Sequence, residues 1–241
     1  MANIIHIETS TDTCSVALSQ DGLCIFNRED RNGPSHAKVL APMVEDAIET
    51  ADSRGLSLDA AAVSAGPGSY TGLRIGVSTA KGLCYGRNLK LVGISTLELM
   101  CVPVLLGETK GCNTITNDAG DINDDLLFCP MIDARRMEVY TALYDCRLKP
   151  LKEVEAKIID ESSYQDVLAE RPIVFFGNGA TKCKNVIKHD NAHFIDGIEP
   201  LARYMLPLAD KSLMENRTED VAYFEPFYLK EFIAGTPKKL F

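Results

Sequence analysis

Apolar and polar positions in the first half of the chain follow the patterns of short strands and amphipathic helices. Residues 4–8 and 14–18 are apolar runs on either side of a polar turn, which predicts a β-hairpin with Glu8 at the end of its first strand. Residues 35–51 carry apolar side chains at helical spacing and acids on the opposite face, so they predict an amphipathic helix. A second helix is predicted over residues 71–85.

The second half of the chain repeats the hairpin design. Residues 130–144 again give an extended run, a short turn and an alternating strand, with Asp133 at the end of the first strand. Superposing Glu8 on Asp133 brings residues 17–18 onto residues 142–143 without a gap. This internal similarity predicts two related lobes whose acids face a common cleft.

The most specific segment is glycine-rich and runs from Gly66 to Gly76, between the apolar run 60–63 and the predicted helix. Its glycines and proline favour a tight strand-to-helix turn. Such a turn is either a cradle for phosphate or carboxylate, through free N–H groups at a helix start, or a plain turn. The glycine-rich segment 177–180 follows the buried strand 173–176 in the same way, and it is either support for a nucleotide or a simple loop.

Three small residues, Gly72, Gly76 and Ala80, recur every four positions along the predicted helix. Glycine lowers helix propensity, so this stripe indicates that another part of a protein packs very close to it. The neighbour is either the chain's own sheet or a second subunit.

A polar segment divides the chain into three parts. The predicted N-terminal lobe is 1–106, the linker or insertion is 107–127, and the C-terminal lobe is 128–241. Acids and amides within the insertion do not follow the ligand order of a calcium loop, so we expect a solvated loop. The aromatic segment 225–230 is expected to dock on the body of the protein.

Composition limits the possible functions. The chain has 241 residues, 46% of them hydrophobic, and a formal net charge of −9, which opposes broad contact with phosphate backbones. If the protein serves nucleic acid, we therefore expect a partner to hold it. Residues 1–9 lack the pattern of a signal peptide and no stretch is long enough to cross a membrane, so we expect a cytoplasmic protein without membrane contact. The eight cysteines are scattered singly, as reduced buried thiols would be.

No catalytic or metal-binding signature is present. The sequence contains no nucleophile elbow, zinc-protease motif or kinase motif. His189 and His193 are four residues apart but lie in a polar stretch that indicates a surface turn, and His36 has no second histidine at position 40. We therefore predict no catalytic residue and no metal site.

Several segments together resemble the TsaB (YeaZ) family over most of the chain. They are Ile7-Glu8-Thr9-Ser10, Ser35-His36, Gly66 to Gly76, Ile132-Asp133-Ala134-Arg135-Arg136-Met137-Glu138-Val139-Tyr140 and Tyr228-Leu229-Lys230. The resemblance implies an α/β protein with the actin-like ATPase (ASKHA) fold and two ribonuclease-H-like lobes. Three positions depart from the family pattern: Glu8 replaces the usual Asp, Lys230 replaces the usual Arg, and the insertion is long.

The function implied by this resemblance is that of a non-catalytic subunit. Such a subunit binds and activates the TsaD transferase, which forms N6-threonylcarbamoyladenosine at position 37 of tRNAs reading codons that begin with A. A TsaE-type ATPase and a second copy of the chain are further implied partners, and tRNA is reached mainly through partners. The alternative is a stand-alone ATP-dependent phosphotransferase of the same superfamily, with Glu8 or Asp133 binding metal.

Two sets of site residues follow from the resemblance. The predicted partner interface comprises His36, Leu40, Met43, Val44, Tyr70, Thr71, Gly72, Leu73, Ile75, Gly76, Thr79 and Ala80. The predicted nucleotide-binding residues are Glu8, Thr9, Ser10, Thr11, Asp133, Gly177, Asn178 and Gly179. No cofactor is expected to bind tightly, and ATP or ADP with magnesium is expected only at a partner interface. The substitution Gly76→Arg is expected to leave the monomer folded and to abolish partner binding.

Overall fold

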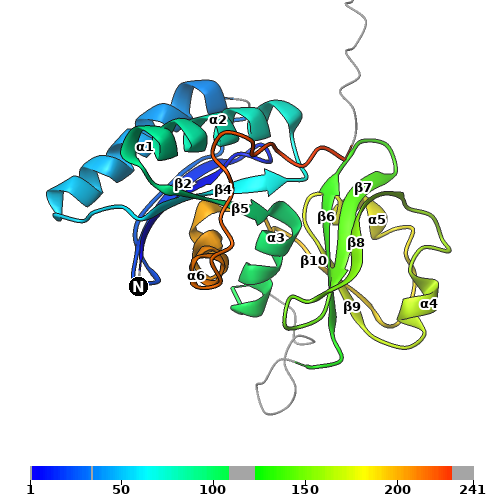
Figure 1. Cartoon of the computed structure of the whole chain (residues 1–241). Helices are drawn as coiled ribbons and strands as arrows, with labels where there is room; N and C mark the ends of the chain where they lie inside the picture. Colours follow the sequence, from blue (N-terminus) through cyan, green and yellow to red (C-terminus); the bar gives the residue numbers. More distant parts are fainter. Residues whose placement is uncertain (1, 34, 109–122, 230–241) are drawn as a thin grey trace, which may run out of the picture.

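The structure is a computed structural model that describes residues 2–33, 35–108 and 123–229. Two five-stranded sheets lie side by side, each flanked by helices (Figure 1). The first has the strand order β3-β2-β1-β4-β5 and the second the order β8-β7-β6-β9-β10. Each sheet is an antiparallel meander of three strands followed by two parallel strands, which confirms two related lobes.

The first lobe begins with a hairpin and adds helices on both faces of its sheet. Its strands are β1 (Asn3–Glu8), β2 (Cys14–Gln20), β3 (Leu23–Asp30), β4 (Ala60–Gly66) and β5 (Lys90–Ser95). Its helices are α1 (His36–Ser53), α2 (Tyr70–Arg87) and α3 (Thr96–Leu105). The predicted first hairpin and both predicted helices are confirmed.

The second lobe repeats this order with shorter helices. Its strands are β6 (Leu127–Asp133), β7 (Glu138–Tyr144), β8 (Pro150–Ile158), β9 (Ile173–Phe176) and β10 (Ala192–Ile195). Its helices are α4 (Gln165–Leu168) and α5 (Ala180–Cys183), and the 3-10 helix η1 (Ala202–Met205) and helix α6 (Leu206–Met214) follow.

The two hairpins differ by one residue in their turns. His6 lies opposite Ala17 in the first hairpin, whereas the equivalent Met131 lies opposite Thr141 in the second. The predicted gapless superposition of residues 17–18 on 142–143 is therefore wrong by one residue on the returning strand. The turn of the second hairpin is one residue shorter, which shifts the pairing of β7 by one residue. Such a shift moves each side chain of the strand to the opposite face of the sheet.

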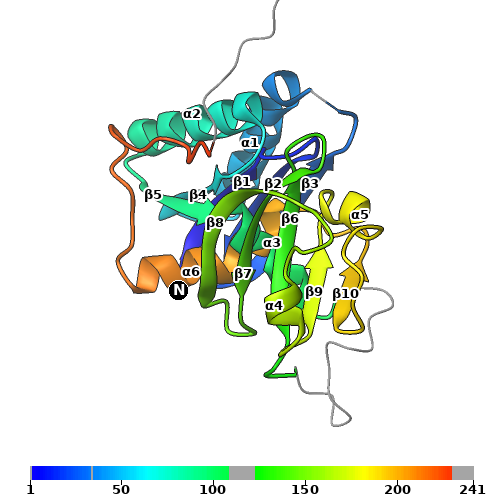
Figure 2. The same ribbon diagram turned by 90° about the vertical axis from the view of Figure 1, so that its right-hand side faces the viewer.

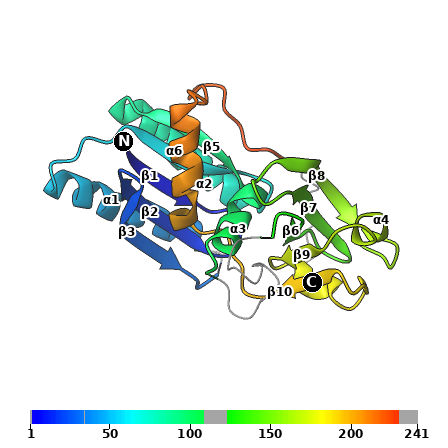
Figure 3. The ribbon, with the colours of Figure 1, turned by 90° about the horizontal axis from the view of Figure 1, so that it is seen from below.

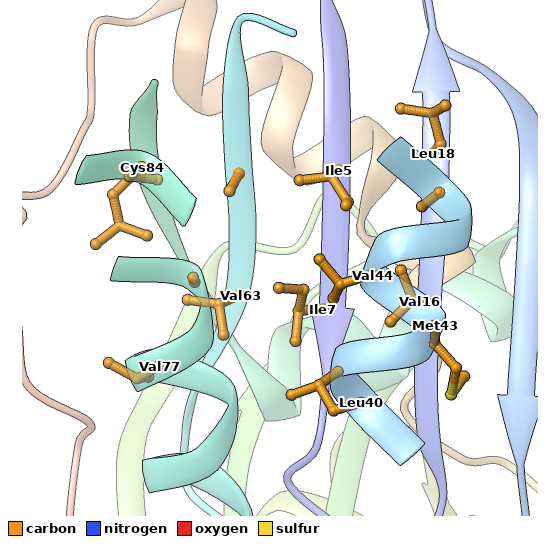
Figure 4. Close-up of a cluster of buried hydrophobic side chains, with 14 of the residues drawn as sticks. Ile5, Ile7, Val16, Leu18, Leu40, Met43, Val44, Val63, Val77 and Cys84 are labelled. Carbon is orange, nitrogen blue, oxygen red and sulfur yellow. The ribbon is translucent and has the colours of Figure 1, made fainter. Parts of the chain in front are cut away.

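The main core of the first lobe lies between its sheet and the helices α1 and α2. Figure 4 shows Leu40 and Val44 of α1 and Val77 of α2 over the apolar side chains of β1, β2 and β4. These side chains are nearly fully buried, so apolar burial holds both helices on the sheet.

The chain returns to the first lobe after β10. Helix α6 and η1 pack on the face of the first sheet opposite α1 and α2, against residues such as Ile4 and Val92 (Figure 2). Helix α3 lies between α6 and the second sheet (Figure 3). Part of the predicted C-terminal lobe, 128–241, thus supplies a layer of the first.

The last described segment, which we call the C-terminal strap (residues 218–229), lies along the edge of the first lobe. The backbone N–H of Glu219 donates to the carbonyl of Leu91 at 2.8 Å. The ammonium group of Lys81 donates to the carbonyl of Phe224 at 3.0 Å. Within the aromatic segment itself, Phe227 and Tyr228 also contact the first lobe, so the expected docking on the body is confirmed for the residues up to 229.

Among the helices of the described ranges, none has both the length and the apolar character needed to cross a bilayer.

Candidate functional site

The two lobes meet at a cleft of about 630 Å³ that collects the turns singled out in the sequence. The first lobe contributes the hairpin turn and the start of α2, the second contributes the end of β6 and the following turn, and the strap closes one side. The lining residues are Ser10, Thr11, Asp12, Pro67, Gly68, Ser69, Tyr70, Thr71, Ile132, Asp133, Ala134, Arg135, Tyr140, Asn178, Phe227, Tyr228 and Leu229.

The glycines of the turn between β4 and α2 let two backbones touch. A β-carbon added to Gly68 would overlap the carbonyl oxygen of Ser10, and one added to Gly72 would overlap the carbonyl oxygen of Thr9. The N–H of Ser69 donates to the carbonyl of Ser10 at 2.7 Å. The Ser69 hydroxyl accepts the N–H of Gly72 at 3.3 Å and caps α2. Close packing and internal hydrogen bonds therefore account for these glycines, which favours the plain tight turn over an anion cradle.

The small-residue stripe on α2 faces the interior of the chain. A β-carbon on Gly76 would overlap the Thr9 hydroxyl, and Ala80 is fully buried in the core. The neighbour that the stripe required is thus the chain's own first lobe. An arginine at Gly76 would disrupt this packing, so the expectation that Gly76→Arg leaves the monomer folded is wrong.

Most of the predicted partner residues lie inside the first lobe. The buried ones are His36, Leu40, Met43, Val44, Gly72, Leu73, Gly76 and Ala80. The side chain of His36 is 7% exposed and its Nε2 lies 2.9 Å from the carbonyl oxygen of Thr11, so it is a hydrogen-bonded core histidine. Only Tyr70, Thr71, Ile75 and Thr79 keep part of their surface on the outside.

The glycine-rich turn after β9 packs in the same manner in the second lobe. Gly177 has φ +98°, a left-handed conformation that favours glycine, and a β-carbon there would overlap the carbonyl oxygen of Met131. The side-chain oxygen of Asn178 accepts the N–H of Asp133 at 2.8 Å. Each glycine turn thus holds the end of the acid-bearing strand of its own lobe.

Glu8 is fully buried and does not line the cleft. Its Oε1 accepts the N–H of Ser10, whereas its Oε2 has no hydrogen-bond partner in the part of the chain that the structure describes. Burial raises the pKa of Glu8 from about 4.5 to about 7, although hydrogen bonds from Ser10 and Ser64 oppose this rise. The prediction that both acids face the cleft is therefore wrong for Glu8.

Asp133 lines the cleft, and a lysine lies on its carboxylate. Its side chain is 46% exposed and forms an ion pair with Lys182, which also donates to the carbonyl of Glu138 at 2.7 Å. Partial burial raises the pKa of Asp133, but the hydrogen bond from Lys182 and the N–H of Arg135 outweigh it, and the pKa stays below its ordinary value.

The predicted nucleotide-binding residues divide into two groups. Ser10, Thr11, Asp133 and Asn178 line the cleft together, whereas the remaining members are packed behind it; these are Glu8, Thr9, Gly177 and Gly179.

The two strand-end acids do not fit a magnesium nucleotide. A hard divalent cation needs several accessible oxygen ligands, but Glu8 is fully buried and Asp133 is paired with Lys182. Asp12 is the other acid that lines the cleft, and its side chain is exposed. Within the described residues, no group of three or more His, Cys, Asp or Glu side chains is placed to hold a metal ion.

An aromatic wall at the cleft was not predicted as part of the site. The rings of Tyr70 and Tyr228 lie 4.9 Å apart, and the guanidinium of Arg74 lies 5.3 Å from the centre of the Tyr70 ring. The N–H of Phe227 donates to the carbonyl of Ala65 at 2.7 Å and fixes the strap there. The aromatic composition of 225–230 predicted that this segment docks on the protein, but its sequence did not indicate that it docks at the cleft. Lys230 and residues 109–122 of the insertion lie outside the described residues.

Comparisons with known proteins found a matching family model and several similar curated proteins. The model of the family described as TsaD: tRNA N6-adenosine threonylcarbamoyltransferase matches residues 32–236. The chain is 32% identical over 238 residues to the tRNA threonylcarbamoyladenosine biosynthesis protein TsaB of Escherichia coli (strain K12), covering 96% of each. It is 29% identical over 188 residues to the protein of the same name from Bacillus subtilis (strain 168), covering 77% of this chain and 75% of the relative.

Solved structures show the same fold. A Pseudomonas aeruginosa protein described as similar to peptidase YEAZ superposes with a TM-score of 0.77 at 22% identity, covering 95% of this chain and 100% of that one. The structure described as YeaZ from Pseudomonas aeruginosa gives a TM-score of 0.74 at 23% identity with the same coverage. The predicted two-lobed α/β fold is thereby confirmed.

Proposed function

The chain belongs to the TsaB family and takes part in tRNA threonylcarbamoyladenosine biosynthesis, and we propose that it does so as a non-catalytic subunit. In this proposal it binds the TsaD-type transferase and activates it by binding its productive state preferentially. The product is N6-threonylcarbamoyladenosine at position 37 of tRNAs that read codons beginning with A.

The non-catalytic role is supported mainly by the surroundings of Glu8 and Asp133, the acids at the ends of β1 and β6. A phosphotransferase of this fold needs a carboxylate free to hold a metal ion at the cleft. Glu8 is sealed in the first lobe and Asp133 is neutralised by Lys182, so neither offers one. The alternative of a stand-alone ATP-dependent phosphotransferase therefore lacks the two metal ligands expected of it, Glu8 and Asp133, although the exposed carboxylate of Asp12 also lines the cleft.

The outer face of α2 supports partner binding. Gly82 and Gly86 are exposed there, and a β-carbon on either would meet no atom within 4 Å. A glycine inside a helix costs about 1 kcal/mol relative to alanine, and no packing among the described residues requires these two. The side chain of Tyr85, which lies between them in sequence, is 87% exposed. A partner helix could therefore pack closely on the face that carries Gly82 and Gly86. The stripe of Gly72, Gly76 and Ala80 faces the interior of the chain instead.

The same face would serve a second copy of this chain when no transferase is present. Contact with a TsaE-type ATPase would then arise on the assembled complex. ATP or ADP with magnesium at a partner interface would need further ligands from the partner, because neither Glu8 nor Asp133 offers a free carboxylate at the cleft.

The test measures threonylcarbamoyladenosine on tRNA with the cognate transferase and remaining components, with and without this chain. Light scattering of the same mixtures reports the mixed complex. We expect product formation to depend on the chain and a complex to form. Full product without the chain, together with no complex, would contradict the proposal, and phosphoryl transfer to a small substrate by the chain alone would support the phosphotransferase.

A substitution on the outer face tests where the partner binds. Gly82→Arg points into open space and is expected to leave the fold intact while lowering complex formation. Asn185→Arg, at an exposed position of the second lobe, is the matched control and should bind normally. Equal binding by both variants would place the interface elsewhere.

A further inference from the structure

A second groove, of about 540 Å³, shares no lining residue with the interlobe cleft. It lies where α3, α6 and the hairpin of β7 and β8 come together, near the region between α6 and β8 that Figure 3 shows from below. Both lobes therefore contribute to its walls.

Positive side chains dominate this groove although the chain as a whole has a net charge of −9. The cations that line it are Arg147, Lys149, Lys152, Lys211 and Arg217. The carboxylates that line it are Glu98, Glu153 and Glu215. The groove thus carries a local excess of positive charge, which attracts anions over about 10 Å at moderate salt.

Two of these five cations form ion pairs and three form none within the described residues. Arg217 pairs with Glu215 at 2.6 Å, and Lys152 lies 3.7 Å from Asp166. For the other three, the described ranges contain no carboxylate within ion-pair distance; these are Arg147, Lys149 and Lys211.

One of the acids that line the groove, Glu98, has a raised pKa. Glu98 is half-buried, and burial raises its pKa, while the charges of Lys211 and Arg217 oppose this rise.

The turn between β7 and β8 holds its two cations in place. The Asp145 carboxylate accepts the N–H of Arg147 and the N–H of Lys149, both at 2.9 Å. Lys211 faces the same groove from α6. Cations from two lobes thus border one groove whose lining is mostly charged, which suits a polyanion better than an apolar protein surface.

We infer that this groove binds the phosphate backbone of the substrate tRNA. The inference rests on the proposed function, which brings the complex to a tRNA, and it adds a direct contact to the expectation that tRNA is reached mainly through partners. The contact positions the RNA without reading its sequence, because phosphates carry no sequence information.

The test compares two double charge reversals in the full chain bound to its cognate transferase. Lys149→Glu with Lys211→Glu changes the groove, and Lys184→Glu with Lys188→Glu makes the same change of charge at exposed positions of the second lobe. Fluorescence anisotropy of labelled tRNA gives the affinity between about 50 and 200 mM salt. We expect the groove variant to lose about tenfold in affinity and to lower the salt slope by about 1.5, since each phosphate contact contributes about 0.7–0.9. The control should stay within about twofold, because exposed charges away from the contact are largely screened.

Light scattering first verifies that each variant still forms the complex, which separates this inference from the proposed function. Lys149→Gln with Lys211→Gln repeats the measurement with a milder change, and circular dichroism verifies the fold. Equal losses in the groove and control variants would overturn the inference. So would competition of inorganic phosphate for the groove without any effect of the variants on tRNA, which would indicate a small-anion site.

Discussion

Glu8 and Asp133 end equivalent strands of two related lobes, but the first acid is sealed inside its lobe and the second faces the cleft. Burial raises the pKa of Glu8 to about 7, whereas Lys182 keeps the pKa of Asp133 below its ordinary value. The backbone around both acids is built alike, with a glycine turn packed on each strand end. A shared backbone therefore does not determine the charge state of the side chain it presents.

The largest expected effect is on stability. It concerns a contact that both lobes contain, in which a glycine turn packs against the end of a strand. Gly72→Ala would force its methyl group into the carbonyl oxygen of Thr9. We expect a loss of more than about 3 kcal/mol in the free energy of unfolding, since both overlapping parts are packed backbone. Chemical denaturation monitored by circular dichroism measures it.

Gly82→Ala is the matched control on the same helix, because its methyl group meets open space. It should raise the free energy of unfolding by about 1 kcal/mol, as alanine favours a helix over glycine. Gly177→Ala extends the test to the second lobe and should destabilise the protein as Gly72→Ala does. If Gly72→Ala were as stable as the wild type, the close contact would be refuted.

The next effect is the pH dependence of stability, which should differ between Glu8 and Asp133. The pKa of Glu8 is about 7 in the folded chain and near 4.5 when unfolded, so the folded state holds the proton longer. The wild type should therefore lose stability as pH rises from about 4.5 to 7, by roughly 3 kcal/mol. Glu8→Gln removes the titrating group, and its stability relative to the wild type should rise across this window in denaturation curves.

A constant difference between Glu8→Gln and the wild type from pH 4.5 to 8 would show that Glu8 titrates normally. The amide itself changes hydrogen bonding at Ser10, but that contribution does not vary with pH in this range, so the slope and not the offset carries the test.

The smallest effect is expected at Asp133. Its folded pKa is lowered, so its ion pair with Lys182 stabilises the fold above about pH 4 and this contribution disappears as pH falls further. Asp133→Asn should cost less than about 1 kcal/mol at pH 7, because a half-exposed pair is screened by water. Thermal unfolding at pH 7 and pH 3 measures the difference, and a cost that persisted at pH 3 would contradict the ion-pair explanation.

Features encoded over short distances could be predicted from the sequence. Apolar periodicity located the hairpins, α1 and α2, and the glycine-rich segments located both strand-to-helix turns. The function of those glycines depends on contacts with Thr9 and Met131, which lie far away in sequence. Periodicity therefore gave the turns but not their neighbours, and it left open whether the small-residue stripe of α2 faces the chain's own sheet or a second subunit. The family resemblance placed the stripe at a partner interface, whereas its neighbour is the chain itself.

The parts that could not be predicted depend on distant segments meeting. The burial of Glu8 follows from the closure of the first lobe over it, and the one-residue difference between the hairpins arises in their turns. The cation groove joins the turn after β7 to α6, some 60 residues later in the chain, so no local pattern marks it. The resemblance to a known family implied the fold and a partner but no such contact.

The return of α6 to the first sheet bears on how the protein is made. Ribosomal synthesis delivers β5 roughly 110 residues before α6, which at about 5–20 residues per second leaves an interval of roughly 6–20 s. During that time the nascent first sheet lacks the helix that covers Ile4 and Val92. The lobe that begins first is thus finished last, and the growing chain must keep an apolar sheet face from aggregating until its final helix leaves the ribosome.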